Sequence, residues 1–296
     1  MSWFKNFEWK KFGKELYEKV LGTDVFGRSA QVGFYFSFAF FPLLLFLVTL
    51  FGIVLGSTTS LQEQLFQYLA RIMPGEAFHL VQTTMGEIIQ SSTGSKLTLG
   101  LLVTLWSASA GVDSLRDSLN SVYEVDEDRA WWYTKLQSLT VTLMFILLIG
   151  IALGALAAGW TMLEQAISLF GYQVTSTWVL SVIQWVGLAV VMILSTAVIY
   201  SWLPSFEEFR WVWVSPGAIV AIILWAVLTG AFRVYLQYFN SYNKAYGSLG
   251  AVIILMLWMY LTGMALLIGG AINSVLTEMS EGSGAKEALV QEKEGR

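Results

Sequence analysis

The sequence Asn240-Ser-Tyr-Asn-Lys-Ala-Tyr-Gly-Ser-Leu-Gly250 leads into an apolar run that closes with Gly269-Gly-Ala-Ile-Asn273. No charged residue lies between Lys244 and Glu278, a length sufficient for a helix to cross a bilayer. Glycines and alanines near the end of this run let neighbouring backbones approach closely. We therefore expect residues 249–276 to form a transmembrane helix at the packing centre of an all-α protein.

The composition of the whole chain agrees with a membrane protein. Of its 296 residues 56% are hydrophobic and only 13% are charged, whereas soluble domains carry about 25% charged residues. Cysteine is absent, which excludes disulfides, thiolate nucleophiles and thiolate metal sites. We expect one helical membrane domain over residues 1–277, followed by a polar, disordered cytoplasmic tail over residues 278–296.

Stretches without charge predict a polytopic protein with six transmembrane helices. Their expected ranges are 29–56, 97–119, 136–160, 178–201, 215–232 and 249–276. Pro42 lies inside the first helix and predicts a kink there. Ser215 and Pro216 are suited to the N-cap and first position of the fifth.

The connection over residues 57–96 carries two helical apolar patterns separated by Pro74-Gly75. They predict a helical hairpin on the outer membrane surface. Its apolar faces could instead cover the ends of the spanning helices.

Residues 3–21 place Trp9, Phe12, Leu16 and Val20 at helical spacing with lysines between them. This pattern predicts a basic amphipathic helix on an anionic leaflet, or else a charged terminus that only sets topology. Most of the 17 Lys and Arg residues lie in this segment, in the 2–3 and 4–5 connections, and in the tail. The positive-inside rule then places both termini in the cytoplasm.

Several motifs resemble the YihY/BrkB family of bacterial inner-membrane proteins. They are Phe34-Tyr-Phe-Ser-Phe-Ala-Phe-Phe-Pro42, Trp106-Ser-Ala-Ser109, Leu119-Asn-Ser-Val-Tyr123, Leu203-Pro204, Ser215-Pro-Gly-Ala218, Tyr242-Asn243, Tyr246-Gly-Ser-Leu-Gly-Ala251 and the terminal Gly-Gly-Ala-Ile-Asn273. The resemblance covers residues 19–277. It implies a bacterial inner-membrane location and a helical membrane fold, but no settled activity; some members of the family have carried the label ribonuclease BN.

Catalytic patterns are absent from the sequence. It has no phosphate-binding loop, zinc-protease motif or dinucleotide fingerprint, and no serine motif accompanies His79, the only histidine. The acidic run from Glu124 to Asp128 lies in a short loop beside few cations, a poor match to the basic groove of a nuclease. We expect no enzyme, no cofactor, no metal site and no nucleic-acid partner. Membrane lipids are the expected partners, and a homo-oligomer is left open.

Polar residues in or beside the predicted spans are the candidate functional residues. Asp113, Arg116, Asp117 and Asn120 fall on one helical face. That face is either the mouth of a solute pathway or a helix end carrying surface ion pairs. Arg233 could simply snorkel outward from a helix end.

The residues before the last helix predict a tightly folded, partly buried loop on the outer side. Gly247 and Gly250 flank its turn, and Asn243 and Tyr246 are expected to form hydrogen bonds inward. Asn273, at the other end of that helix, could bond a neighbouring helix. The complete set of pathway or structural-lock candidates is Ser37, Pro42, Ser107, Ser109, Asp113, Arg116, Asp117, Asn120, Gln184, Arg233, Asn243, Tyr246, Gly247, Gly250 and Asn273.

Three functions fit these features. The first is a permease or channel-like transporter of a small solute or ion, which would be passive or ion-coupled because no ATP-binding motif is present. The second is a transporter of lipid or of an amphiphilic envelope precursor. The third is a membrane scaffold that transports nothing and serves envelope maintenance. A water-filled polar cavity favours the first, a groove open to lipid the second, and a solid core the third.

Overall fold

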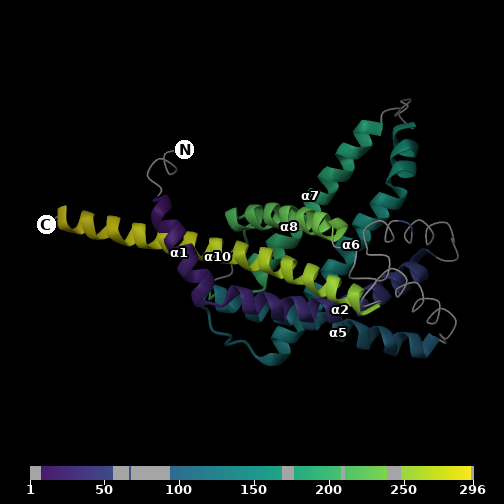
Figure 1. The fold of residues 1–296 in the computed structure, drawn as a ribbon, viewed down its shortest axis with the longest axis horizontal. Helices are drawn as coiled ribbons and strands as arrows, with labels where there is room; N and C mark the ends of the chain where they lie inside the picture. The colour runs from purple at the N-terminus through teal and green to yellow at the C-terminus, as the bar shows by residue number, and fades with distance from the viewer. Residues whose placement is uncertain are drawn as a thin grey trace.

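The computed structural model describes residues 8–55, 67, 94–168, 177–207, 211–238 and 248–294. Within these ranges the chain forms long helices (Figure 1): α1 Trp9–Gly22, α2 Val25–Leu55, α5 Gly94–Val122, α6 Trp131–Ser168, α7 Thr177–Trp202, α8 Pro216–Tyr238 and α10 Ser248–Glu294. The predicted hairpin lies outside the described residues, apart from residue 67 and the start of α5. The loop that holds Asn243, Tyr246 and Gly247 also lies outside them.

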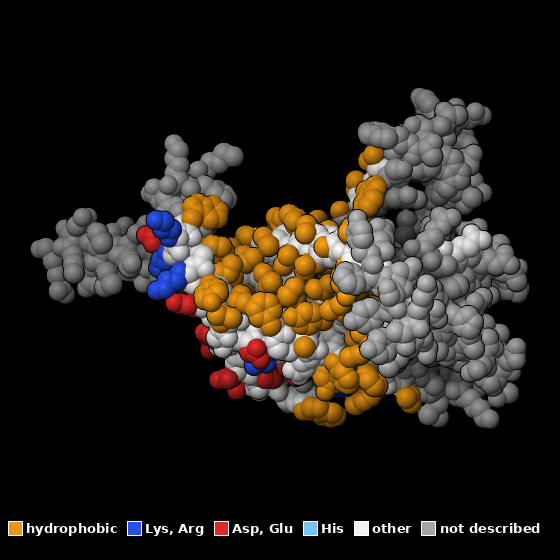
Figure 2. Space-filling model, viewed as in Figure 1, with side chains coloured by type: hydrophobic (Ala, Val, Ile, Leu, Met, Phe, Trp, Pro, Cys, Tyr) orange, Lys and Arg blue, Asp and Glu red, His pale blue; other side chains and the backbone are white. Residues whose placement is uncertain are grey.

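The six helices from α2 to α10 coincide with the six predicted spans. Among the described residues, four stretches are long and apolar enough to cross a membrane: Trp131–Ala152, Trp185–Trp202, Pro216–Leu236 and Val252–Ser280. The chain is therefore a multi-pass helical membrane protein, and membrane crossing by α2 and α5 stays a prediction. Figure 2 shows hydrophobic side chains over the middle of the molecule and charged side chains toward the end where α1 lies.

One detail differs from the sequence-based expectation, and one prediction is left untested. The backbone of α10 continues as a helix to Glu294, where we expected a disordered tail, because Ala, Glu, Lys, Leu and Gln dominate residues 285–294 and favour helix. α2 runs through Pro42 without a break in its assigned helix; the kink expected at this proline stays a prediction.

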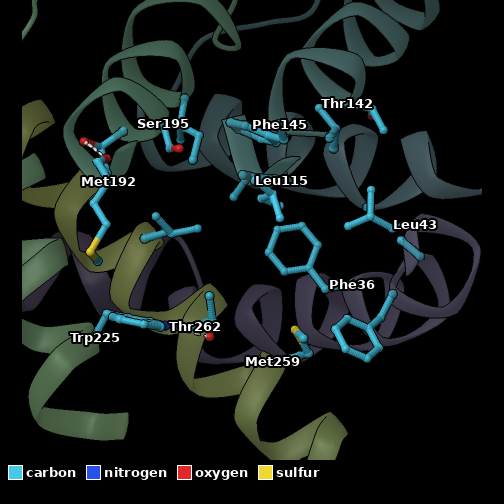
Figure 3. A pocket seen from close by; sticks show the side chains of 18 of the residues that line it. Phe36, Leu43, Leu115, Thr142, Phe145, Met192, Ser195, Trp225, Met259 and Thr262 are labelled. Atoms are coloured by element: carbon cyan, nitrogen blue, oxygen red, sulfur yellow. Dashed lines mark hydrogen bonds between the residues drawn. The ribbon is translucent and has the colours of Figure 1, made fainter. Parts of the chain in front are cut away.

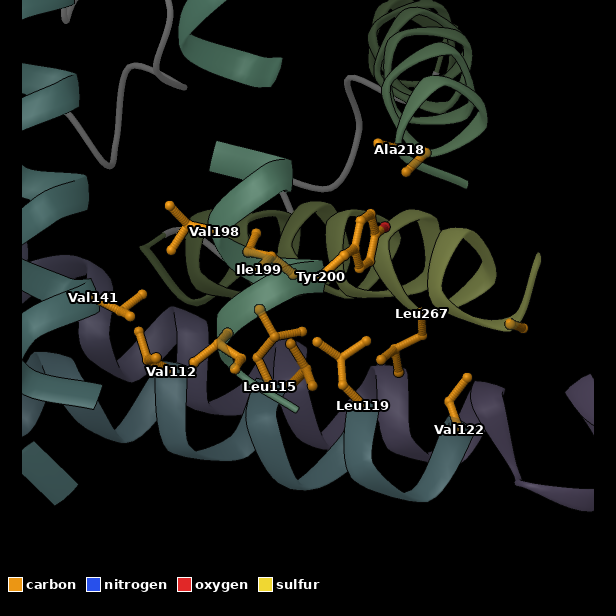
Figure 4. Close-up of a cluster of buried hydrophobic side chains, with 14 of the residues drawn as sticks. Val112, Leu115, Leu119, Val122, Val141, Val198, Ile199, Tyr200, Ala218 and Leu267 are labelled. Carbon is orange, nitrogen blue, oxygen red and sulfur yellow. The ribbon is translucent and has the colours of Figure 1, made fainter. Parts of the chain in front are cut away.

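The centre of the fold is the packing of α2 against α5 and α10, with α8 lying along α10. Figure 4 shows the buried cluster at this centre, to which α5 contributes one row of apolar residues and α7 contributes the end of its helix. The cluster includes Val112, Leu115, Leu119, Val122, Val198, Ile199, Tyr200, Leu203 and Leu267. These residues fill the bundle toward the charged end of the molecule.

Close approach of backbones fixes two helix crossings. A Cβ atom at Gly33 of α2 would lie 2.7 Å from the backbone of Tyr260 in α10. At the crossing of α8 and α10, a Cβ atom at Gly269 would lie 2.6 Å from the carbonyl oxygen of Gly217, and one at Gly217 would overlap the carbonyl oxygen of Gly269. Only glycine permits such contacts, in the way small residues do at membrane helix interfaces.

α5 ends in a turn of Schellman type. The Val125 N–H donates to the Asn120 carbonyl at 2.9 Å, and the Glu124 N–H donates to the Ser121 carbonyl at 3.2 Å. Glu124 occupies the left-handed position of this turn with φ of 55°, where glycine is the usual residue. The carboxylate of Glu124 is thereby turned toward α1.

Candidate functional site

A network of charged side chains lies between α5, α6 and the loop that joins them. Arg116 is at its centre, with a side chain that is only 8% exposed. Its guanidinium donates to Asp113 at 3.2 Å and to Asp117 at 3.1 Å. It also donates to the Thr134 carbonyl at 2.9 Å and to the Ser138 hydroxyl at 3.0 Å on α6. One arginine therefore joins the polar face of α5 to the first turns of α6.

Lys135 makes the second bridge between these helices. Its ammonium donates to Ser109 and to Asp113, both at 2.7 Å. It also lies 4.4 Å from the centre of the Trp106 ring, a distance at which an aromatic face attracts a cation. Because its side chain is 11% exposed, these contacts replace most of the hydration that the ammonium loses.

The loop after α5 completes the network. The Asn120 amide donates to Glu127 at 2.9 Å, while its oxygen accepts the N–H of Ser205 at 2.9 Å. Arg129 donates to Glu127 at 2.6 and 2.5 Å and to the Leu203 carbonyl at 3.0 Å. Burial raises the pKa of Glu127, but the hydrogen bonds from Arg129 and Asn120 outweigh it and hold that pKa below its usual value. The loop is thereby attached to the end of α7.

These contacts define what we call the charge network. Its members are Ser109, Asp113, Arg116, Asp117, Asn120, Glu127, Arg129 and Lys135. Three cations face three carboxylates, so the network is electrically balanced. Such balance is needed where ion pairs are partly desolvated, because an uncompensated buried charge is strongly destabilising.

A second ionic contact fastens α1 to the bundle. The Lys19 ammonium, 6% exposed at the side chain, lies 3.1 Å from Glu124 and 2.7 Å from Glu278 of α10. Burial lowers the pKa of Lys19, but the two carboxylates outweigh it and raise that pKa above its usual value. We call Lys19, Glu124 and Glu278 the lysine junction; it joins α1, the turn after α5 and the C-terminal half of α10.

Asn273 connects α10 to the first turn of α8. Its oxygen accepts the Gly217 N–H at 2.8 Å, and its amide donates to the Ser215 hydroxyl at 2.9 Å. Ser215 itself accepts the Ala218 N–H at 3.1 Å as the N-cap of α8. The N–H groups of the two residues after Pro216, which has none of its own, are thus satisfied, one of them by a residue more than fifty positions away. Asn273 bonds a neighbouring helix, as the sequence suggested.

An apolar cavity of about 410 Å³ lies among the six long helices (Figure 3). α5 lines it with Ala108, Gly111, Val112 and Leu115, which lie on the helix face away from Asp113 and Arg116. The rest of its lining is Phe36, Ala39, Phe40 and Leu43 of α2; Thr142, Phe145 and Ile149 of α6; Val191, Met192, Ser195, Thr196 and Ile199 of α7; Ala221, Ile222 and Trp225 of α8; and Trp258, Met259, Thr262 and Leu266 of α10. Within the described part of the chain, no charged residue lines it.

Three of the four hydroxyls that line this cavity, those of its threonines, are already engaged within the protein. Thr142 donates to the Ser138 carbonyl at 2.7 Å, and Thr196 donates to the Met192 carbonyl at 3.0 Å. Thr262 donates to the Trp258 carbonyl at 3.0 Å and accepts the indole N–H of Trp225 at 3.1 Å. The cavity therefore presents few free hydrogen-bond donors to an occupant, and an apolar group fits it best.

The other candidate residues are scattered. Ser37 and Ser107 donate their hydroxyl protons to carbonyls of their own helices, at Gly33 and Val103. Pro42 is half-buried in α2, Gly250 is buried in the first turn of α10, and Arg233 is exposed on α8. The side chain of Gln184 lies outside the described part, as do Asn243, Tyr246 and Gly247.

The sequence did not reveal which residues pair with the polar face of α5 that carries Asp113, Arg116, Asp117 and Asn120. Lys135 and Arg129 entered only as charges that set topology, and Glu127 entered only as part of an acidic turn. The available signal was charge balance: a helix face with two aspartates and one arginine needs further cations from elsewhere. Lys19 belongs to the basic segment that was expected to lie on an anionic leaflet or to set topology, whereas it is one of the most buried charged side chains described.

Comparison with known proteins identifies a family and a relative of this chain. The profile of the family described as Virulence factor BrkB matches residues 16–293. A protein of Bacillus subtilis (strain 168) named "Putative ribonuclease-like protein YfkH" is 30% identical over 265 residues, which cover 90% of this chain and 94% of that protein. No solved structure matches.

Proposed function

We propose that this chain, which belongs to the BrkB family, binds a membrane amphiphile in the apolar cavity and carries it between the leaflets of the bacterial inner membrane. The observation that carries this proposal is the lining of the cavity. All six long helices contribute to it, its lining is almost wholly hydrocarbon and aromatic, and its volume of about 410 Å³ lies within the range of small-molecule sites.

The exposure of α7 supports access from lipid. All residues from Trp185 to Val190 are exposed, and Trp185 itself is 71% exposed. Six consecutive residues exceed one and a half helical turns, at about 3.6 residues per turn, so every side of this part of α7 is uncovered. The same helix lines the cavity from Val191 onward. An acyl chain could therefore pass from the lipid beside α7 into the cavity without crossing a polar surface.

A permease for a small solute or ion, our first expectation from sequence, has less support. An ion needs oxygen ligands or a wet path, and the charges of α5 lie on the opposite face from the cavity. They are also paired with one another. The charge network supports a structural task instead, which is to hold α5 and α6 at a fixed crossing beside the cavity.

We also propose that both termini lie in the cytoplasm. The start of α1 and the end of α10 lie toward the same end of the molecule (Figure 1), which is consistent with an even number of spans. The Lys and Arg bias of the sequence selects the cytoplasmic side.

Transport is tested with purified full-length protein in liposomes that contain a fluorescent phospholipid. Dithionite added outside destroys the probe in the outer leaflet, so further loss reports movement between leaflets. We expect the wild type to move the probe and Ser195→Phe, which fills the cavity, to slow it at least tenfold. Ala189→Phe, on an exposed part of the same helix, is the matched control and should behave as wild type.

The folded state of each variant is checked by its melting temperature in detergent. A wild type that leaves the probe in place contradicts the proposal for phospholipids. A folded Ser195→Phe variant with wild-type rates excludes the cavity as the route.

A further inference from the structure

We propose that α1 is a binding surface for anionic lipid headgroups, held at a fixed place on the bundle by the lysine junction. The inference does not depend on transport. It rests on the three faces of α1, on its position at the edge of the apolar belt, and on the way Lys19 is held.

The three faces of α1 follow from its periodicity of about 100° per residue. One face holds Leu16, Lys19 and Val20; the two apolar residues pack against the buried core, and Lys19 enters the junction. A second face holds Lys11, Glu15 and Glu18, which are suited to water. This division leaves a third face to be explained.

The third face combines apolar residues and lysines. Tyr17 is 66% exposed and Leu21 is 51% exposed. Lys10 and Lys14 are exposed on the same side of the helix, and Lys14 at its edge also lies 3.7 Å from Glu18. Exposed apolar side chains flanked by lysines are the pattern of a helix at the lipid headgroup level, where the lysine stems lie along acyl chains and the ammonium groups reach phosphates.

The position of α1 points to the same partner. Figure 1 shows α1 crossing the line of α10 steeply, so that α1 lies across the bundle axis. In Figure 2 the blue side chains of this region lie where the orange belt ends. The charged side chains of the molecule gather toward the end where α1 lies. A helix in this place meets the lipid headgroups of the leaflet on that side. An anionic leaflet attracts Lys there by about 1 kcal/mol per residue, which is about fivefold in an equilibrium constant.

The lysine junction makes this contact part of the folded structure. Because Lys19 bonds Glu124 and Glu278 from a nearly buried position, α1 cannot roll freely about its axis. The junction consequently decides which lysines face lipid and which face water. That constraint is the basis of a matched test on adjacent residues.

The test uses single cysteines, since the chain has none of its own. Tyr17→Cys and Glu18→Cys are labelled with a nitroxide and reconstituted in nanodiscs with or without phosphatidylglycerol. Collision with oxygen reports lipid, and collision with a water-soluble nickel complex reports water. In anionic discs we expect the ratio of oxygen to nickel collisions to be severalfold higher at position 17 than at position 18. We expect the difference to shrink in neutral discs and at high salt.

Charge dependence is tested by adding Lys10→Gln or Lys11→Gln to the Tyr17→Cys protein. Both remove one positive charge, but only Lys10 lies on the proposed lipid face, so only Lys10→Gln should reduce the effect of phosphatidylglycerol. Equal effects of the two substitutions, or equal ratios at positions 17 and 18, would overturn the proposal. A label at position 17 shielded from both reagents would instead show that protein covers this face.

Discussion

The α5–α6 interface and the α8–α10 interface fasten helices in opposite ways. Between α5 and α6, buried ionic side chains such as Arg116 and Lys135 span the gap. Between α8 and α10, Gly217 and Gly269 bring the two backbones into contact. The first interface depends on charge balance, because its pairs are partly desolvated. The second depends on the absence of side-chain volume. The two should therefore fail under different substitutions and different solution conditions.

The largest effect is expected from Arg116→Leu. This substitution leaves Asp113, Asp117 and Glu127 without their shared cation in a partly buried place, and breaking such a contact costs about 3–5 kcal/mol of unfolding free energy. The measurement is unfolding of the purified protein in mixed detergent micelles. Arg233→Leu, at an exposed position of α8, is the control and should change little. Equal stability of both variants would mean that the network is hydrated and contributes nothing.

Gly269→Ala should come next. The added methyl group meets the Gly217 carbonyl oxygen and the Ala221 Cβ atom at 2.6 and 2.7 Å, and forcing these helices apart costs about 1–3 kcal/mol. Gly230→Ala in α8 is the matched control because no atom lies within 4 Å of its added Cβ. The control should be neutral or stabilising by up to about 1 kcal/mol. A tolerated Gly269→Ala would show that the crossing can shift freely.

Asn273→Ala probes the polar part of the same α8–α10 interface. It removes the acceptor of the Gly217 N–H and should cost about 0.5–2 kcal/mol, as for other lost helix caps. Thr277→Ala, one turn later, removes a hydroxyl that donates to the Asn273 carbonyl within the same helix and should cost less. The comparison is made by melting temperature in one detergent. If both variants melt together, the first turn of α8 is capped sufficiently by Ser215.

The smallest effect is a pH dependence confined to the α5–α6 side. Since the pKa of Glu127 is lowered by folding, its contribution is present above the usual carboxyl value of 4.5 and is lost as pH falls through the folded-state pKa. The wild type should therefore lose its stability advantage over Glu127→Gln as the pH falls from 6 to below 4.5. The difference in melting temperature between the two is the quantity to follow. A difference that stays constant would exclude Glu127 as a titrating member.

Sequence periodicity predicted the helices well because a charge-free run bounded by charges has few alternatives in a membrane protein. The predicted ranges for all six spans fall on helices, and Ser215 with Pro216 marked the start of α8 correctly. The face shared by Asp113 and Arg116 was also correct, since a helix places residues three apart on one side.

Contacts between distant segments could not be read in this way. The pairing of Lys19 with Glu278 joins positions 259 residues apart, and no local pattern specifies such a partner. Leu115 shows the same limit: it is fully buried and lines the cavity, and the residues that meet it from other helices have no local signal in the sequence. Nor could spacing reveal the cavity, because its walls come from six helices whose crossings depend on glycine contacts and the charge network together.

The left-handed conformation of Glu124 has a consequence for engineering this protein. A non-glycine residue in the left-handed conformation costs about 1–2 kcal/mol, so Glu124→Gly would be a natural first choice for thermostabilisation. Yet that carboxylate is half of what holds Lys19 in place. The unfavourable backbone conformation of Glu124 is thus accompanied by an ion pair that fixes the orientation of α1. Glu124→Gly would raise the melting temperature in detergent but let α1 rotate at the membrane surface. A screen that scored only melting temperature would therefore select a variant with a less fixed α1.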